Sequence, residues 1–299
     1  MSGHLIFRPS TTAGRACAAG FVFLATAFPL GAQVSVPPRN HLYDRLELGV
    51  AASFVLDRSE ARVDSPEGEV GTTFSLTSAL GMPSATVQPV VGLRWKPTRR
   101  AELELSYQFL NQSGQRTITQ NLEIGGDSVY AGLRSTSDLG SDDATLQLKY
   151  ALWAGDAHTV GLALGVGAIF FRLQVDAEGD ASGGGGSVVD TVRIDKRFTG
   201  PTASIGAFGN VRLGPRWYVG ADVRAFAVQF DRYSATVAEG NLLARYYLSD
   251  HWGVATSLYY TDATIEVMPP ETRSGDASDL FGSVKHAYTS LRLGVIGAF

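Results

Sequence analysis

The chain has 299 residues, of which 44% are hydrophobic and 18% are charged, with a formal net charge of −4 and a mean hydropathy of +0.03. Its basic residues form no cluster or stripe, so the charge pattern gives no sign of nucleic-acid binding. Beyond the N-terminal region, no stretch approaches the ~18 uninterrupted apolar residues typical of a membrane-spanning helix.

The N-terminal region has the pattern of a secretory signal peptide. Arg8 and Arg15 precede an apolar run over residues 16–30, and the small pair Gly31-Ala32 follows it. We expect cleavage after Ala32, which makes 1–32 the signal and 33–299 a single domain. A membrane anchor is the alternative, but the run is shorter than the ~20 residues that a spanning helix needs. Cys17 lies at the beginning of the apolar run instead of closing it, two residues after Arg15, so a lipoprotein is not expected, and the mature chain has no thiol chemistry.

Ten segments of the mature chain then alternate between apolar side chains on one parity and polar or small side chains on the other. This period of two predicts β-strands with one apolar face. The segments are 45–54, 86–96, 102–109, 145–152, 161–170, 204–213, 218–225, 241–248, 252–260 and 291–299.

The connections between these segments alternate in length. Short ones lie at 97–100, 155–158, 214–216 and 249–251, and long ones at 57–84, 111–142, 174–199 and 262–286, with a brief exception near 231–235. The run Gly183–Gly186 predicts a mobile loop tip. Residues 117–124 and 128–135 flank Gly125-Gly126-Asp127 and predict a hairpin that extends two strands beyond the membrane. If this hairpin entered the bilayer instead, the strand count would rise to twelve.

The last strand carries the most specific signal. Leu291, Leu293, Val295 and Phe299 share one parity, and the chain ends on the aromatic residue. This ending resembles the final strand of bacterial outer-membrane β-barrels, and nearly the whole mature chain is similar to the small barrels of the outer membrane protein A and W type. The resemblance implies an all-β, antiparallel up-and-down transmembrane barrel of about ten strands, with eight or twelve as alternatives. A secreted β-sandwich is the soluble alternative.

The same resemblance implies a location and partners. Short turns and both mature termini are expected on the periplasmic side and long loops on the extracellular side of the outer membrane. Phe299 is expected to be part of the signal read by the barrel assembly machinery. Outer-membrane lipid is the other expected partner, and the loops are candidate contacts for an extracellular ligand.

Trp95, Trp217 and Trp252 lie beside short turns with the lipid-facing parity, as in an aromatic girdle. Trp153 has the opposite parity, so it either points inward or follows a bulge.

If the apolar parity faces lipid, the other parity lines a lumen with a positive excess. The charged residues of that parity are Arg45, Glu47, Arg94, Lys96, Glu102, Glu104, Lys149, Arg212, Asp222, Arg224, Glu239, Arg245 and Arg292. We expect these groups to form ion pairs, since an unpaired charge in a narrow tube is costly. Glu102 and Glu104 lie across a short turn from Arg94 and Lys96, which makes cross-strand pairs reasonable. A plugged, structural lumen and a narrow channel of weak anion preference are both compatible with this pattern.

No enzyme, cofactor or metal site is expected. Asp142-Asp143 and His286 are the candidate acid and imidazole groups at the level of the loops, but adjacent residues on a strand point to opposite faces. Ser290 is about 13 Å along the strand from His286, too far for a Ser–His pair. His41, at the periplasmic end, is expected to be solvated. The functional interpretations are a structural or surface-interaction barrel, a narrow solute channel and, as the weakest, an outer-membrane hydrolase.

Overall fold

The computed structural model describes residues 39–65, 69–181, 188–230, 233–268 and 281–299. The predicted signal peptide and the Gly183–Gly186 loop tip lie outside these residues. Apart from the short helices η1 (His41–Tyr43) and α1 (Leu76–Leu80), the regular elements are strands. None of the helices in the described part of the chain is long and apolar enough to span a membrane.

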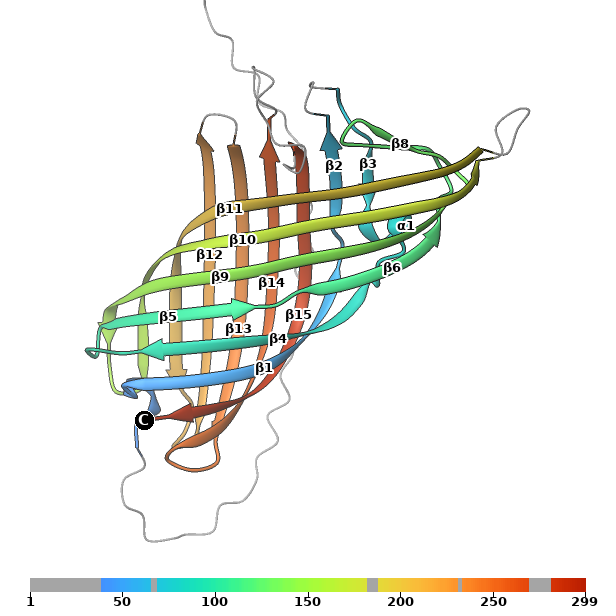
Figure 1. Ribbon diagram of the computed structural model, residues 1–299. Coiled ribbons are helices and arrows are strands. Elements are labelled where there is room, and N and C mark those ends of the chain that lie inside the picture. The colour runs from blue at the N-terminus through green and yellow to red at the C-terminus, as the bar shows by residue number, and fades with distance from the viewer. Residues whose placement is uncertain (1–38, 66–68, 182–187, 231–232, 269–280) are drawn as a thin grey trace, which may run out of the picture. The chain divides into compact units, whose positions relative to one another are not determined.

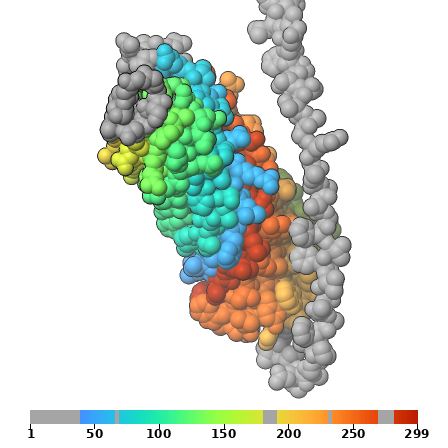
Figure 2. Space-filling model, turned by 90° about the vertical axis from the view of Figure 1, so that its right-hand side faces the viewer, coloured from blue at the N-terminus to red at the C-terminus, as the bar shows by residue number. Residues whose placement is uncertain are grey.

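Ten antiparallel strands pair in sequence order, and the last pairs with the first (Figure 1). They are β1 (Leu46–Asp57), β4 (Ala85–Trp95), β5 (Ala101–Gln108), β9 (Arg134–Ala154), β10 (His158–Ala181), β11 (Val188–Arg212), β12 (Trp217–Phe230), β13 (Tyr233–Tyr247), β14 (Trp252–Val267) and β15 (Phe281–Ala298). The ring closes through eleven residue pairs between β1 and β15. Figure 2 shows this seam, where β1 (blue) lies against β15 (red). The predicted ten-stranded up-and-down barrel is confirmed.

The wall carries an apolar band on its outer face, which we call the lipid belt. On β10, every outward-facing residue from Val160 to Phe170 is apolar. The corresponding stretches are Trp252–Tyr260, where Thr256 interrupts the apolar residues, and Leu291–Phe299. These lengths match the ~9–11 residues with which a tilted strand crosses a bilayer. The belt lies next to the short connections, at what we call the turn end of the barrel. The opposite end is the loop end.

Above the belt the apolar parity inverts. Phe170 faces outward at the top of the belt, whereas Leu173, Val175 and Ala177 of the same strand face inward and are fully buried. The reason is that the outer face passes from lipid into water while the inner face meets other parts of the chain. The predicted loop at 174–199 is therefore largely wrong, because β10 and β11 continue as strands through most of it. The predicted loop at 262–286 is wrong at both ends, where β14 runs to Val267 and β15 begins at Phe281.

The two other predicted loops fold into small elements that pack on this extension. The first holds β2 (Glu60–Asp64), β3 (Thr73–Ser75) and α1, and the second holds β6 (Asn111–Thr117), β7 (Leu122–Ile124) and β8 (Asp127–Val129). β2 pairs with β15, and β6 pairs with β9. The β7–β8 turn has Gly125 and Gly126 at φ 66° and 91°, as a two-residue hairpin turn requires.

Together these elements build an apolar core inside the loop end. The largest fully buried side chains in it are Val63, Leu76, Leu80, Leu122, Ile124, Val129, Leu133, Leu173, Val175 and Ile194. They come from β2, α1, β7, β8 and the extended parts of β10 and β11, and from the segments between them. We call this group the loop-end core. Its side chains fill the space between the long strands at the loop end. The lumen of the barrel therefore lies between this core and the turn end.

Candidate functional site

Glu47 is the centre of a charged layer across the turn end of the lumen. Its carboxylate pairs with Arg94 of β4 and with Arg245 of β13, the latter at 3.7 Å. The hydroxyl of Tyr247 donates a hydrogen bond to the same carboxylate at 2.8 Å. Three strands from both halves of the barrel thus meet on one buried acid.

The rest of this layer is a chain of lysine and glutamate pairs. Lys96 lies 2.8 Å from Glu102, and Lys149 lies 2.5 Å from Glu104 and 3.9 Å from Glu102. Glu102 is directly opposite Lys149 across the β5–β9 pair, whereas Glu104, which Lys149 contacts more closely, is opposite Gln147 and therefore diagonal to it. Arg94 is opposite Glu104 across the β4–β5 pair and opposite Glu47 across the β1–β4 pair, and its guanidinium contacts Glu47. We call these residues, with those around Glu47, the turn-end charge layer.

A second set of charges lies one level higher. Arg224 pairs with Asp222 at 3.4 Å and with Glu239 at 3.0 Å. Tyr259 donates to Glu239 at 2.5 Å, and the Arg292 guanidinium lies 4.0 Å from the centre of the Tyr259 ring.

The charged residues predicted to face the lumen are buried or half-buried, with one exception. Arg45 is exposed in the bend before β1, because the strand begins only at Leu46. Its assignment to the lumen is therefore wrong.

The turn end is also filled by the segment that enters the barrel. The His41 ring stacks on Tyr247 with centroids 3.6 Å apart, and its Nδ1 lies 2.7 Å from Asp44. Leu42 is buried, and its carbonyl accepts a hydrogen bond from Lys96 Nζ at 2.5 Å. The expectation that His41 is solvated is wrong. The sequence does carry one sign that this segment is buried, which is the apolar Leu42 next to His41 before the first strand.

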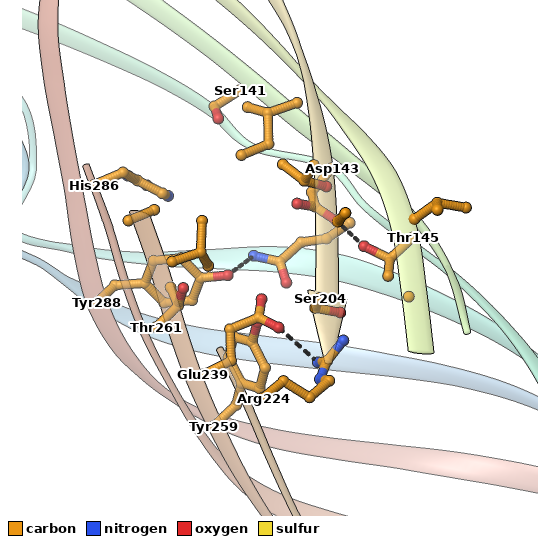
Figure 3. Close-up of a pocket in the computed structure, with 18 of the residues that line it drawn as sticks. Ser141, Asp143, Thr145, Ser204, Arg224, Glu239, Tyr259, Thr261, His286 and Tyr288 are labelled. Carbon is orange, nitrogen blue, oxygen red and sulfur yellow. Dashed lines mark hydrogen bonds and ion pairs between the residues drawn. The ribbon is translucent and has the colours of Figure 1, made fainter. Parts of the chain in front are cut away.

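A small cavity with both polar and apolar lining residues lies between the charged levels and the loop-end core. Its volume is about 50 Å³, room for a few water molecules at roughly 10–15 Å³ each. Asp143 and Thr145 of β9 line one side, and His286 and Tyr288 of β15 line the other (Figure 3). Asp142 instead faces outward, where its carboxylate accepts a hydrogen bond from Tyr107 at 3.1 Å.

Ser59 contacts His286, a pairing that sequence reasoning missed. The Ser59 Oγ lies 2.7 Å from His286 Nδ1 and donates to Asp57 at 2.5 Å. Ser59 is 227 residues from His286 in the chain, so only the barrel closure brings them together. In a nucleophilic triad the imidazole lies between the hydroxyl and the acid. Here the buried hydroxyl lies between the other two groups, so its proton is directed at the acid and not at the base.

The aromatic residues at the turn end lie as a girdle would place them. Trp95, Trp217 and Trp252 are exposed on the outer face. Trp153 is also outward, with 66% of its surface exposed, because the β9–β10 register shifts between Val160 and Gly161. The bulge alternative thus holds for Trp153. Phe299 is half-exposed, and its backbone closes the seam.

No protein-family model matches the sequence, and no curated protein sequence matches it either. Among solved structures, the chain is similar to the outer membrane protease OmpT of Escherichia coli, with a TM-score of 0.54 at 11% identity over 86% of this chain and 97% of that one. Weaker matches are the toluene transporter TodX of Pseudomonas putida (TM-score 0.36, 12% identity, 85% and 89% coverage) and the outer membrane protein OprG of Pseudomonas aeruginosa (0.33, 11%, 86% and 97%). At these identities a likeness bears on fold alone. The closed antiparallel ring, the lipid belt and the likeness to OmpT give one conclusion: the chain has the fold of a bacterial outer-membrane β-barrel.

Proposed function

We propose that this chain is an integral outer-membrane barrel with a sealed lumen and a structural or surface-interaction role. The observation that carries the proposal is the filled turn end, where the η1 segment and the turn-end charge layer occupy the tube together. The loop-end core fills the other end. In this proposal the signal peptide is cleaved, both mature termini are periplasmic and the loop end faces outward.

The charge arrangement supports a structural lumen over a conducting one. Glu47, Glu102 and Glu104 each contact at least one buried or half-buried cation. A paired charge inside a protein is held in place by the same contacts that offset its desolvation. An ion passing through would have to displace these pairs, and His41 and Leu42 below them, before reaching the periplasmic side.

Single-channel recording tests the proposal. We expect the refolded mature chain, residues 33–299, to give no discrete current steps in a planar bilayer. Removing the plug by the double substitution His41→Ala and Leu42→Ala serves as the positive control, and we expect it to increase leakage. Reproducible steps from the parent chain, with an ion preference that changes in Arg245→Gln, would establish the narrow channel instead.

We also propose that the barrel is not a hydrolase. The Ser59 proton is directed at Asp57, Ser59 itself is buried, and Asp142 and Asp143 lie on opposite faces of β9. The test is hydrolysis of peptide and ester substrates by the refolded chain. Activity that disappears in His286→Ala, while that variant keeps its folded gel mobility, would revive the enzyme interpretation.

A further inference from the structure

The small cavity beside His286 contains hydroxyl groups that the protein itself does not satisfy. Ser141 and Thr261 line the cavity and are only 8% and 5% exposed. Neither hydroxyl has a hydrogen-bond partner among the described residues, and Figure 3 shows them on different sides of the same space. A buried hydroxyl without a partner is costly, so the two groups indicate a ligand between them.

Asp143 adds a carboxylate to the same cavity. One of its oxygens accepts a hydrogen bond from the Thr145 hydroxyl at 2.7 Å, which leaves its negative charge in place. In the described part of the chain, no lysine or arginine forms an ion pair with Asp143. Its charge is therefore balanced by groups farther away or by a bound ion.

Carboxylates outnumber guanidiniums around the cavity. Arg224 lies between two of them, 3.4 Å from Asp222 and 3.0 Å from Glu239. The Arg292 guanidinium contacts an aromatic ring and donates to an amide oxygen at 2.8 Å. With Asp143, three carboxylates thus face two guanidiniums.

His286 adds an acceptor and not a positive charge. The Ser59 hydroxyl donates to Asp57, so it accepts from the protonated Nδ1 of His286 in their 2.7 Å contact. Burial lowers the pKa of His286, so above about pH 6.5 its Nε2 carries a lone pair. Asp57 is a fourth buried carboxylate. The turn-end charge layer has one cation in excess, which offsets only part of this negative charge.

The strand ladder of the wall ends beside the cavity. Thr202, Ala203 and Ser204 of β11 bound the cavity on this side. They lie directly above Ile205, which forms the last pair between β11 and β12 in the described residues. An ion from the loop end can therefore reach the cavity without crossing the turn-end charge layer.

We propose that this cavity binds one small monovalent cation, for which Na⁺ is the probe. Asp143 supplies the charged ligand and the hydroxyls of Ser141 and Thr261 supply neutral ones, because hard cations prefer oxygen ligands. The volume of about 50 Å³ admits such an ion with a few water molecules and excludes choline. One unpaired carboxylate favours a monovalent ion over Ca²⁺, which takes about 6–8 oxygen ligands. The inference goes beyond the proposed function and does not depend on whether the lumen conducts.

The test is urea unfolding of the refolded chain in phosphatidylcholine vesicles, with NaCl replacing choline chloride at constant ionic strength. A ligand that binds only the folded state raises the folding equilibrium constant, and for a Kd of about 10 mM, about 100 mM Na⁺ should raise it about tenfold. We expect Asp143→Asn to abolish this response. Thr261→Val removes one neutral ligand and should require about fivefold more Na⁺ for the same response. The matched control is Asp142→Asn, which removes the same charge from the outward face of the same strand and should keep the parent response.

Several outcomes would overturn the proposal. Equal stabilities of the parent chain in NaCl and in choline chloride would mean that water fills the cavity or that a proton neutralises Asp143, and this comparison needs no variant. An unchanged Na⁺ response in Asp143→Asn, or in Thr261→Val if Asp143→Asn does not fold, would exclude the cavity as the site, as would a response lost equally in Asp142→Asn. A response to Ca²⁺ but not to Na⁺ would indicate a divalent site. A conducting barrel that keeps the Na⁺ response would refute the sealed lumen and leave this inference intact.

Discussion

Removal of the Glu47 carboxylate should destabilise the barrel more than any other single charge change in the lumen. Glu47 compensates Arg94 and Arg245 and accepts the Tyr247 hydroxyl, and it is only 7% exposed. The Glu47→Gln variant keeps the size of the side chain but removes the carboxylate that both guanidiniums contact. Loss of one partner of a buried ion pair costs about 3–5 kcal/mol, and at about 1.4 kcal/mol per tenfold change the folding equilibrium should fall more than a hundredfold.

The assay is urea unfolding of the refolded chain in lipid vesicles, followed by tryptophan fluorescence. The matched control is Glu266→Gln, an exposed glutamate above the lipid belt, which should stay within about 0.5 kcal/mol of the parent. The double variant Glu47→Gln/Arg94→Gln should recover part of the loss, because one uncompensated cation is removed with its partner. A loss below about 0.5 kcal/mol in Glu47→Gln would mean that water solvates the layer, and the sealed-lumen argument would fail with it.

Three further predictions concern packing, closure and pH. Gly161→Ala would place a Cβ 2.0 Å from the Tyr150 carbonyl oxygen, so we expect the free energy of unfolding in urea to fall by about 2 kcal/mol. The control is Gly214→Ala, whose Cβ would have no atom within 4 Å and which should leave the stability unchanged. Equal effects of the two substitutions would contradict this prediction. Deletion of Phe299 removes the N–H that donates to the Leu46 carbonyl at 2.8 Å and the carbonyl that accepts from the Arg45 and Leu46 N–H groups. We expect the deletion to reduce the heat-modifiable folded fraction in cells and Phe299→Tyr to preserve it. An unchanged folded fraction in the deletion variant would show that these seam contacts are not needed for assembly. Burial lowers the pKa of His286, and the nearby Asp57 only partly offsets this. The folded state therefore takes up a proton less readily than the unfolded state, so the stability contribution of the neutral imidazole is complete above about pH 6.5 and is lost as the pH falls toward the folded pKa. Stability of the parent should thus drop more steeply on acidification than that of His286→Gln, and parallel pH profiles would refute the assignment.

The sequence alone determined the part of the fold that lipid dictates. In the belt, most outward positions are apolar and most inward positions are small or polar, so Leu162, Leu164 and Val166 show the strand period directly. The short turns at one end of the strands and the aromatic Phe299 at the end of the chain are also visible in the sequence. Ten strands, their order and their antiparallel pairing could therefore be predicted from the spacing of apolar residues and the lengths of the connections.

The tertiary structure decided what lies beyond the lipid. Above Phe170 the apolar parity changes face, because water replaces lipid outside and the loop-end core forms inside, so Leu173 and Val175 no longer continue the pattern of the belt. A one-residue bulge turns Trp153 outward, and no local signal distinguishes a bulge from an inward residue.

The same holds for contacts between distant segments. The partners of Glu47 come from β4 and β13, and Ser59 meets His286 only because the ring closes. The contacts of a buried charge depend on strand register and on the geometry of the whole ring. Neither can be derived from the spacing of residues along one strand.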